Sequence, residues 1–120
     1  MVGRFTDIRK PMKNNIINQI KESIMIKEAI LDNKEIIEAI EKASQAIIIA
    51  YQDGKKTMLA GNGGSAADAQ HIAGEFVSRF YFDRPGLSSI ALSTDTSVLT
   101  AIGNDYGYEK LFTRQLQAHG

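Results

Sequence analysis

Apolar residues recur at helical spacing through the first half of the chain. In residues 13–31 and again in residues 34–52, apolar residues, most of them isoleucine, return every three or four positions, which is the spacing of one face of an α-helix. Asp32, with Glu35 three positions later, favours the start of the second helix. Gly54 favours its end, because glycine tolerates the left-handed conformation that closes helices. The pattern therefore predicts two consecutive amphipathic helices.

The apolar faces of these helices need a partner surface. They are formed by Ile16, Ile17, Ile20, Ile24, Ile36, Ile37, Ile40, Ala43, Ile47, Ile48 and Tyr51. Faces this apolar are buried in a core or in an interface between packed helices. Because residues 47–49 are three consecutive isoleucines, the second helix is apolar on more than one face, which favours packing in a homo-oligomer. We assign residues 1–54 to an N-terminal helical segment without chemistry of its own.

The second half of the chain changes its period and gains glycine, since eight of the ten glycines lie from Gly61 onward. The elements expected there are a strand over 55–60, a glycine loop over 61–65, a helix over 66–80, a strand over 88–93, a short helix over 96–102 ended by Gly103, and a last helix from Tyr108 to Gly120. Two strands joined through a helix of this length run parallel. Residues 55–120 therefore predict an α/β fold.

Charge and composition remove several classes of function. The 120 residues hold 14 Lys and Arg against 14 Asp and Glu, and no basic cluster stands out, which disfavours nucleic acid and anionic membrane surfaces as partners. The absence of cysteine excludes disulfides and cysteine-ligated zinc, but leaves histidine and carboxylate ligands possible. The longest apolar run, Ala46 to Tyr51, is too short to span a membrane, so we expect a cytoplasmic protein.

The glycine loop Gly61-Asn62-Gly63-Gly64-Ser65 is the first candidate for chemistry. It lies between a strand end and a helix start, where free backbone N–H groups and the helix dipole attract an anion, and glycines let a phosphate approach the backbone. Ser65 with Asp68 also fits a capping box, so the Ser65 hydroxyl is expected to cap the helix, to contact phosphate, or to do both.

Two other phosphate loops fit poorly. The Walker pattern is excluded because no Gly-Lys-Ser/Thr is present. Gly61-x-Gly63-x-x-Ala66 satisfies the loose dinucleotide fingerprint, but no acidic residue ends the second strand about twenty residues later, as NAD binding requires. Asp95, about thirty residues on, is the only acidic residue near a strand end. A Walker-type nucleotide site is therefore excluded, and NAD binding is disfavoured.

Four polar residues, Asp68, His71, Glu75 and Arg79, form a stripe on the helix after the loop, at spacings of three, four and four. His71 and Glu75 could offer a nitrogen and an oxygen to one divalent ion, and Glu75 could act as a general base. Without the glycine loop, an exposed His/Glu pair of this kind would be an ordinary surface pair. With the loop at the start of the helix, the pair lies two to three turns from a bound phosphate, which suits a small phosphorylated sugar.

Further along the chain, the function of the polar residues is less defined. Asn104 and Asp105 could return to the edge of the sheet where α/β proteins bind ligands, and Gly103-Asn104-Asp105 equally fits a plain turn. His119 is the only other histidine, and beside Gly120 we expect it to be a solvated or mobile tail.

Two long runs resemble one family. The run Gly61-Asn62-Gly63-Gly64-Ser65-Ala66-Ala67-Asp68-Ala69-Gln70-His71, with Glu75 four residues later, is similar to the phosphoheptose (sedoheptulose 7-phosphate) isomerases, which have a sugar isomerase (SIS) domain. The run from Ala91 to Gly107, ALSTDTSVLTAIGNDYG, matches as well. The resemblance implies a flavodoxin-like α/β fold, a parallel sheet with helices on both faces, preceded by N-terminal helices that pack into a homotetramer.

The same resemblance implies a function and a set of roles. The expected reaction is a zinc-assisted aldose–ketose isomerisation through an enediol, giving D-glycero-D-manno-heptose 7-phosphate for lipopolysaccharide, capsule or other surface glycans. By position, Glu75 would be the base, His71 and Glu75 would bind zinc, and Arg79 would be an active-site arginine. The expected substrate-binding residues are Asn62, Gly63, Gly64, Ser65, Glu75, Asn104 and Asp105.

The sequence departs from the family at its end. Members continue past Gly120 through a Ser/Thr-rich phosphate loop and a helix with a further Gln and His, so the remaining zinc ligands are expected outside this sequence. We interpret the chain as the N-terminal part of an isomerase, inactive by itself. The alternative is a non-catalytic SIS protein that binds sugar phosphates or a replication initiator. Such proteins lack the carboxylate at Glu75 and differ at Gly64 and Asp68, whereas this chain has all three residues.

Overall fold

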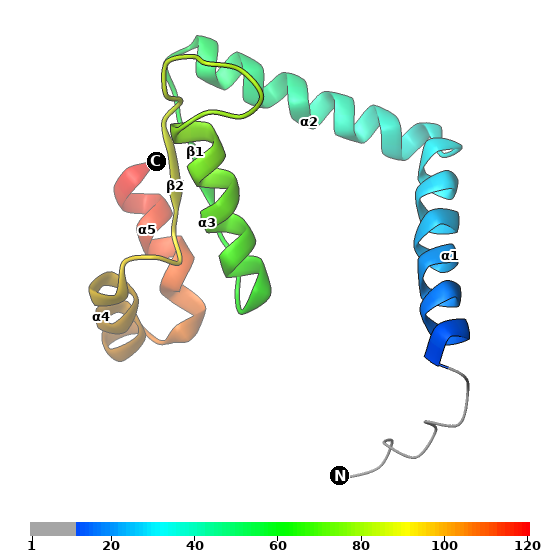
Figure 1. The fold of residues 1–120 in the computed structure, drawn as a ribbon. Helices are drawn as coiled ribbons and strands as arrows, with labels where there is room; N and C mark the ends of the chain where they lie inside the picture. The colour runs from blue at the N-terminus through cyan, green and yellow to red at the C-terminus, as the bar shows by residue number, and fades with distance from the viewer. Residues whose placement is uncertain (1–11) are drawn as a thin grey trace, which may run out of the picture. The chain divides into compact units, whose positions relative to one another are not determined.

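The computed structural model describes residues 12–120, so the first eleven residues of the predicted N-terminal segment lie outside the described part. By their contacts the residues divide into a unit that ends at Gln45 and a unit Ala46–Gly120. The two predicted helices are confirmed as α1 (Met12–Leu31) and α2 (Lys34–Gln52) (Figure 1). The assignment of residues 1–54 and 55–120 to separate domains stays a prediction.

The ends of α2 are closed by two local motifs. The Asn33 side chain accepts a hydrogen bond from the Ile36 backbone N–H at 3.2 Å, so Asn33 caps the helix. The sequence predicts this role for Asp32. That prediction is wrong by one residue, because the capping side chain belongs to Asn33. At the other end Gly54 has φ +69°, and Lys55 N–H donates to the Ala50 carbonyl at 2.8 Å. The predicted glycine closure is therefore confirmed.

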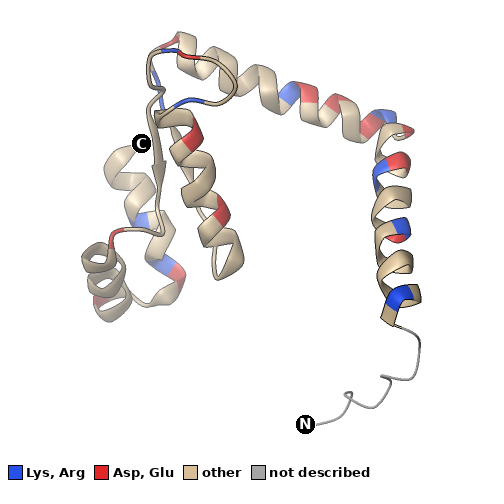
Figure 2. Cartoon of the chain, viewed as in Figure 1, with Lys and Arg blue, Asp and Glu red and all other residues tan. Residues whose placement is uncertain are grey.

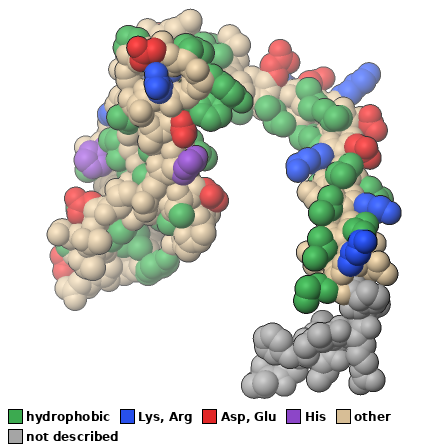
Figure 3. Space-filling view, viewed as in Figure 1, with side chains coloured by type: hydrophobic (Ala, Val, Ile, Leu, Met, Phe, Trp, Pro, Cys, Tyr) green, Lys and Arg blue, Asp and Glu red, His purple; other side chains and the backbone are tan. Residues whose placement is uncertain are grey.

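Neither α1 nor α2 has a buried residue. Ile20 and Ile24 of α1 and Ile40 of α2 are each exposed by half or more. Figure 3 shows hydrophobic side chains along α1, and Figure 2 shows that α2 is charged only in its first half, up to Lys42. Within the described residues the isoleucine faces are therefore not a core, and their burial in an interface remains a prediction.

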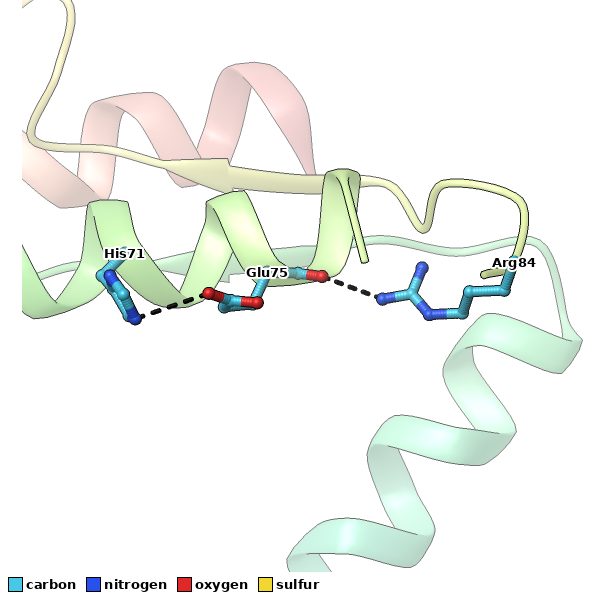
Figure 4. Close-up of polar contacts among 3 residues, drawn as sticks. All are labelled: His71, Glu75 and Arg84. Atoms are coloured by element: carbon cyan, nitrogen blue, oxygen red, sulfur yellow. Dashed lines mark hydrogen bonds and ion pairs between the residues drawn. The ribbon is translucent and has the colours of Figure 1, made fainter. Parts of the chain in front are cut away.

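The second unit contains the α/β part of the chain. Strands β1 (Thr57–Leu59) and β2 (Ser89–Ala91) pair in parallel, with Met58 opposite Ile90, as predicted. Between them runs α3 (Gly64–Val77). After β2 come three further helical elements: α4 (Thr96–Tyr106), the 3₁₀ turn η1 (Tyr108–Lys110) and α5 (Leu111–His119). Figures 1 and 4 show α3 on one side of the strands and α5 on the other.

Small side chains let α3 (Gly64–Val77) approach the strands closely. Ala69 and Ala73 of α3 are buried against Ala91 of β2, and Leu59 of β1 packs beside them. Alanine has a high helix propensity and a short side chain, so it suits a helix packed tightly on a sheet. This packing fixes the start of α3 next to the ends of both strands.

Two helix boundaries differ from the prediction. Helix α3 covers Gly64–Val77 instead of residues 66–80. Helix α4 continues through Gly103 to Tyr106, so the expectation that Gly103 ends it is wrong. The left-handed conformation that ends α4 belongs to Gly107, with φ +88°, four residues later. Asn104 and Asp105 therefore belong to a helix and not to a turn.

Gln115 of α5 ties that helix to the end of β2. Its side chain is buried, and Nε2 donates to the carbonyls of Leu92 and Leu111, both at 2.9 Å. Replacing Gln115 with leucine is expected to lower the free energy of unfolding by about 1–3 kcal/mol, because buried carbonyls lose their donor. Urea denaturation checks this, with the exposed Gln117→Leu on the same helix as the control. Equal stability of the two variants would contradict the structural role of Gln115.

Candidate functional site

The glycine loop is held in shape by Ser65. Its hydroxyl accepts a hydrogen bond from the Asn62 N–H and donates one to the Asn62 carbonyl, both at 2.9 Å. The N-cap of α3 is Gly63, which has φ +58° and no side-chain cap. The capping-box prediction for Ser65 and Asp68 is therefore wrong, because the helix begins two residues earlier than expected. The hydroxyl proton of Ser65 is already used within the loop.

Gly61 is required by close packing. A Cβ built at this position would lie 2.3 Å from the Ser65 carbonyl oxygen and 2.7 Å from the Ser65 hydroxyl oxygen. No larger residue fits without moving the backbone of the first turn of α3. Together Gly61, Gly63 and Ser65 give the loop one tight conformation directly after β1.

A hollow of about 320 Å³ opens beside this loop. It is lined by Gly61, Asn62 and Gly63, by Ser93 after β2, and by Tyr108 of η1. The hollow therefore lies past the carboxyl ends of the two parallel strands, which is where open α/β sheets bind ligands. Of the predicted substrate-binding residues of the loop, Asn62 and Gly63 line this hollow, at the start of a 14-residue helix, whereas Gly64 and Ser65 do not.

Ser93 was missed by the sequence analysis. Its Oγ is buried and has no hydrogen-bond partner among the residues that the structure describes. A buried hydroxyl without a partner costs free energy unless a ligand or water satisfies it. The signal in the sequence was positional, since Ser93 is the last residue of the predicted strand 88–93, and ligand-binding residues of α/β folds lie at such strand ends.

His71 and Glu75 lie together on the surface of α3 (Figure 4). The distance from His71 Nε2 to Glu75 Oε1 is 3.5 Å, with the two side chains 77% and 36% exposed. The prediction that these two side chains lie side by side on the helix is therefore confirmed. Arg79 lies beyond Val77, where α3 ends, so its prediction as part of the helical stripe is wrong.

The donor set of this pair fits part of a zinc site. Two ligands on one tetrahedral zinc, with bonds of about 2.0–2.1 Å, lie about 3.3 Å apart, close to the separation of His71 and Glu75. Within residues 12–120 no group of three or more His, Cys, Asp or Glu could hold a metal. The described residues therefore offer two of the four ligands that such a site needs.

Arg84 is a second residue that the sequence analysis missed. Its guanidinium donates to the carbonyls of Glu75 and Phe76, both at 2.9 Å, and Figure 4 shows the contact with Glu75. These two carbonyls lie in the last turn of α3, where backbone carbonyls lack partners within the helix. It also lines an apolar hollow of about 350 Å³ with His71, Ile72 and Glu75, among others. The contact spans a turn of eight or nine residues, so no periodicity could reveal it.

Neither Asn104 nor Asp105 is among the residues that line the hollow beside the glycine loop. The Asn104 side chain donates to Asp105 at 2.9 Å in the last turn of α4. Asp105 lines a separate hollow of about 250 Å³, together with Arg114 and His119. The structure therefore does not bring Asp105 to the glycine loop, and its contact with a substrate stays a prediction. His119 is exposed and ends α5, with its carbonyl accepting from Lys56 Nζ at 2.6 Å.

The fold and the loop define the class of this protein. The chain belongs to the SIS domain family, whose sequence pattern matches residues 19–120. The phosphoheptose isomerase of Aneurinibacillus thermoaerophilus is 67% identical over 109 residues, which are 91% of this chain and 55% of that protein. Phosphoheptose isomerase 2 of Campylobacter jejuni is 65% identical, over 91% of this chain and 54% of that protein.

Solved structures agree with this assignment. The phosphoheptose isomerase GmhA from Neisseria gonorrhoeae superposes with a TM-score of 0.79 at 36% identity, over 92% of this chain and 55% of that one. The phosphoheptose isomerase from Francisella tularensis gives a TM-score of 0.82 at 32% identity, over 92% and 57%. The chain thus spans somewhat over half the length of these relatives. Among residues 12–120 no helix is long and apolar enough to cross a membrane.

Proposed function

We propose that this chain supplies the glycine-loop half of a phosphoheptose isomerase, which converts sedoheptulose 7-phosphate to D-glycero-D-manno-heptose 7-phosphate. The observation that carries the proposal is that one helix, α3, has the glycine loop at its start and the His71–Glu75 pair two to three turns later. A sugar phosphate has an anionic end and a carbonyl end. The start of the helix suits the phosphate, and the His71–Glu75 pair suits the carbonyl end. The names of the similar proteins support the same activity.

The phosphate end of the substrate binds at the start of α3. The positive end of the helix dipole lies there, and Gly63 and Gly64 leave the backbone accessible. The N–H groups of Ser65 and Ala66 already donate to the carbonyls of Asn62 and Gly63, so the N–H groups of Gly63 and Gly64 are the proposed donors to the phosphate. The buried, unpartnered Ser93 hydroxyl offers a further donor in the hollow beside the loop. Asn62 lines the same hollow. The proposed contacts of Ser65, Asn104 and Asp105 with substrate rest on the family resemblance.

Glu75 is the proposed base. In a ketose-to-aldose isomerisation the base takes a proton from C1 of the ketose and returns it to C2, with an enediol between the two transfers. The carboxylate has two oxygens, so Oε1 can face His71 while the other oxygen moves the proton. Zinc bound by His71 and Glu75 would supply a positive charge that polarises the substrate oxygens.

The native protein is proposed to be a homo-oligomer, a tetramer by the family resemblance. Support comes from α1 and α2, which bury none of their residues within the described chain although isoleucine dominates their apolar faces. Exposed apolar surface of this extent marks an interaction surface.

The test of zinc dependence is metal removal from the native-length protein. Turnover of sedoheptulose 7-phosphate is expected to fall by about 100-fold or more after chelation, and to return with added zinc, because a metal ion stabilises transition-state charge by several kcal/mol. His71→Ala is expected to lower the bound zinc measured by elemental analysis. His119→Ala, the change at the other histidine of this sequence, is the matched control. Zinc content equal in both variants would contradict the assignment of His71.

The alternative function is a non-catalytic SIS protein that binds a sugar phosphate. Glu75 discriminates the two, because binding alone needs no carboxylate beside the histidine. A native-length protein that binds sedoheptulose 7-phosphate in calorimetry without turnover in the presence of zinc would favour the alternative.

A further inference from the structure

The side chain of Asn62 is held by a residue far away in the sequence. Tyr108 of η1 donates its hydroxyl hydrogen to Asn62 Oδ1 at 2.5 Å, across 46 positions. Both residues line the hollow beside the glycine loop. The contact depends on Gly107, whose φ of +88° ends α4 and turns the chain into η1.

This hydrogen bond completes the fixation of Asn62. The backbone N–H and carbonyl of Asn62 are both bound by the Ser65 hydroxyl. With the amide oxygen bound by Tyr108, the amide can no longer rotate freely, and its Nδ2 group is left to donate to a ligand. A donor fixed before binding costs less conformational entropy when the ligand arrives.

We propose that Tyr108 is a positioning residue that orients the Asn62 amide as a hydrogen-bond donor to the sugar phosphate in the hollow. The inference rests on the proposed function for the identity of the ligand. Tyr108 acts through Asn62 and not by touching the reacting atoms. The contact with Asn62 is made by the Tyr108 hydroxyl, so phenylalanine is the substitution that removes it and keeps the ring.

The test is a double-mutant cycle in the native-length protein, with Tyr108→Phe, Asn62→Ala and the two combined. Tyr108→Phe is expected to lower kcat/KM for sedoheptulose 7-phosphate by about five- to tenfold, the usual effect of one hydrogen bond. In the Asn62→Ala background the same change is expected to have no further effect, because the group it orients is absent. A full additional loss in that background would overturn the proposal.

Tyr106→Phe is the matched control. It removes a hydroxyl two residues away that accepts from Arg114 at 3.4 Å and makes no contact with Asn62. The control is expected to leave kcat/KM unchanged, and equal losses in the two tyrosine variants would mean a general structural effect and overturn the proposal. Thermal unfolding midpoints of both variants are expected to agree within a few degrees.

A measurement without turnover separates this inference from the proposed function. The side-chain NH₂ signals of Asn62 in a ¹⁵N correlation spectrum are expected to shift in Tyr108→Phe and not in Tyr106→Phe. The dissociation constant for sedoheptulose 7-phosphate, from calorimetry, is expected to rise by about the same five- to tenfold factor. If both hold in a protein without isomerase activity, the proposed function fails and the positioning role stands. If neither changes in an active isomerase, only the positioning role fails.

Discussion

Replacing Glu75 with glutamine in the native-length protein is expected to lower kcat for sedoheptulose 7-phosphate by about 100-fold or more, with little change in stability. An amide of the same shape cannot accept the proton that the carboxylate would move between C1 and C2. The fold does not depend on the charge, because the side chain is partly exposed and its contact within residues 12–120 is with His71 Nε2 at 3.5 Å. The contact with Arg84 uses the Glu75 carbonyl and stays intact.

Steady-state kinetics and thermal unfolding together check this prediction. Glu41→Gln on α2 removes the same charge from a helix outside the candidate site and serves as the control. We expect full turnover in the control and unfolding midpoints within a few degrees of the unmodified protein in both variants. Unchanged turnover in Glu75→Gln would remove Glu75 as the base.

Gly61→Ala is expected to destabilise the protein by about 3 kcal/mol or more and to abolish ligand binding at the loop. The added methyl group would lie 2.3 Å from the Ser65 carbonyl oxygen and 2.4 Å from its carbon, both of which are backbone atoms. No side-chain rotation can relieve such a contact. The loop or the first turn of α3 must therefore shift, and the hydrogen bonds between Asn62 and Ser65 are lost with it.

The matched control is Gly74→Ala in the interior of the same helix. A Cβ at Gly74 would meet nothing within 4 Å, and alanine favours a helix by up to about 1 kcal/mol over glycine. Urea denaturation is therefore expected to show opposite changes in the free energy of unfolding for the two variants. Equal free energies of unfolding for Gly61→Ala and Gly74→Ala would contradict the close contact between Gly61 and the Ser65 backbone.

The parts of the fold with a local cause were predictable from the sequence. The spacing of isoleucine predicts α1 and α2, and Gly54 closes α2 as expected because the left-handed position depends on neighbouring residues only. The parallel pairing of β1 and β2 follows from the helix between them. The His71–Glu75 pair follows from a spacing of four residues on one helix.

Predictions failed where a boundary shifted by a few residues. Helix α3 begins two residues early, so the Ser65 hydroxyl bonds back to Asn62 instead of capping the helix. Glycine favours helix ends but does not dictate which of two candidates is used. Here Gly107 ends α4 and Gly103 does not, which places Asn104 and Asp105 in the helix.

The residues that were missed share a different cause. Tyr108 meets Asn62 across 46 positions, and Arg84 reaches the end of α3 across a turn. The orphaned hydroxyl of Ser93 is recognised only when its surroundings are known. Such contacts arise from tertiary structure, which neither periodicity nor a short motif records.

The exposed isoleucine faces of α1 and α2 have a thermodynamic consequence. Among the described residues α1 buries nothing, and the contacts of α2 are at its end, where Tyr51 bonds to Thr57 and packs on Phe76. Intrinsic propensity alone is therefore left to offset the loss of backbone entropy in α1, and little else does so in the first half of α2. Any surface that covers the isoleucines stabilises the helical state by mass action. The helical content of this segment is therefore linked to the concentration of its partner, and its folding and its association are one equilibrium.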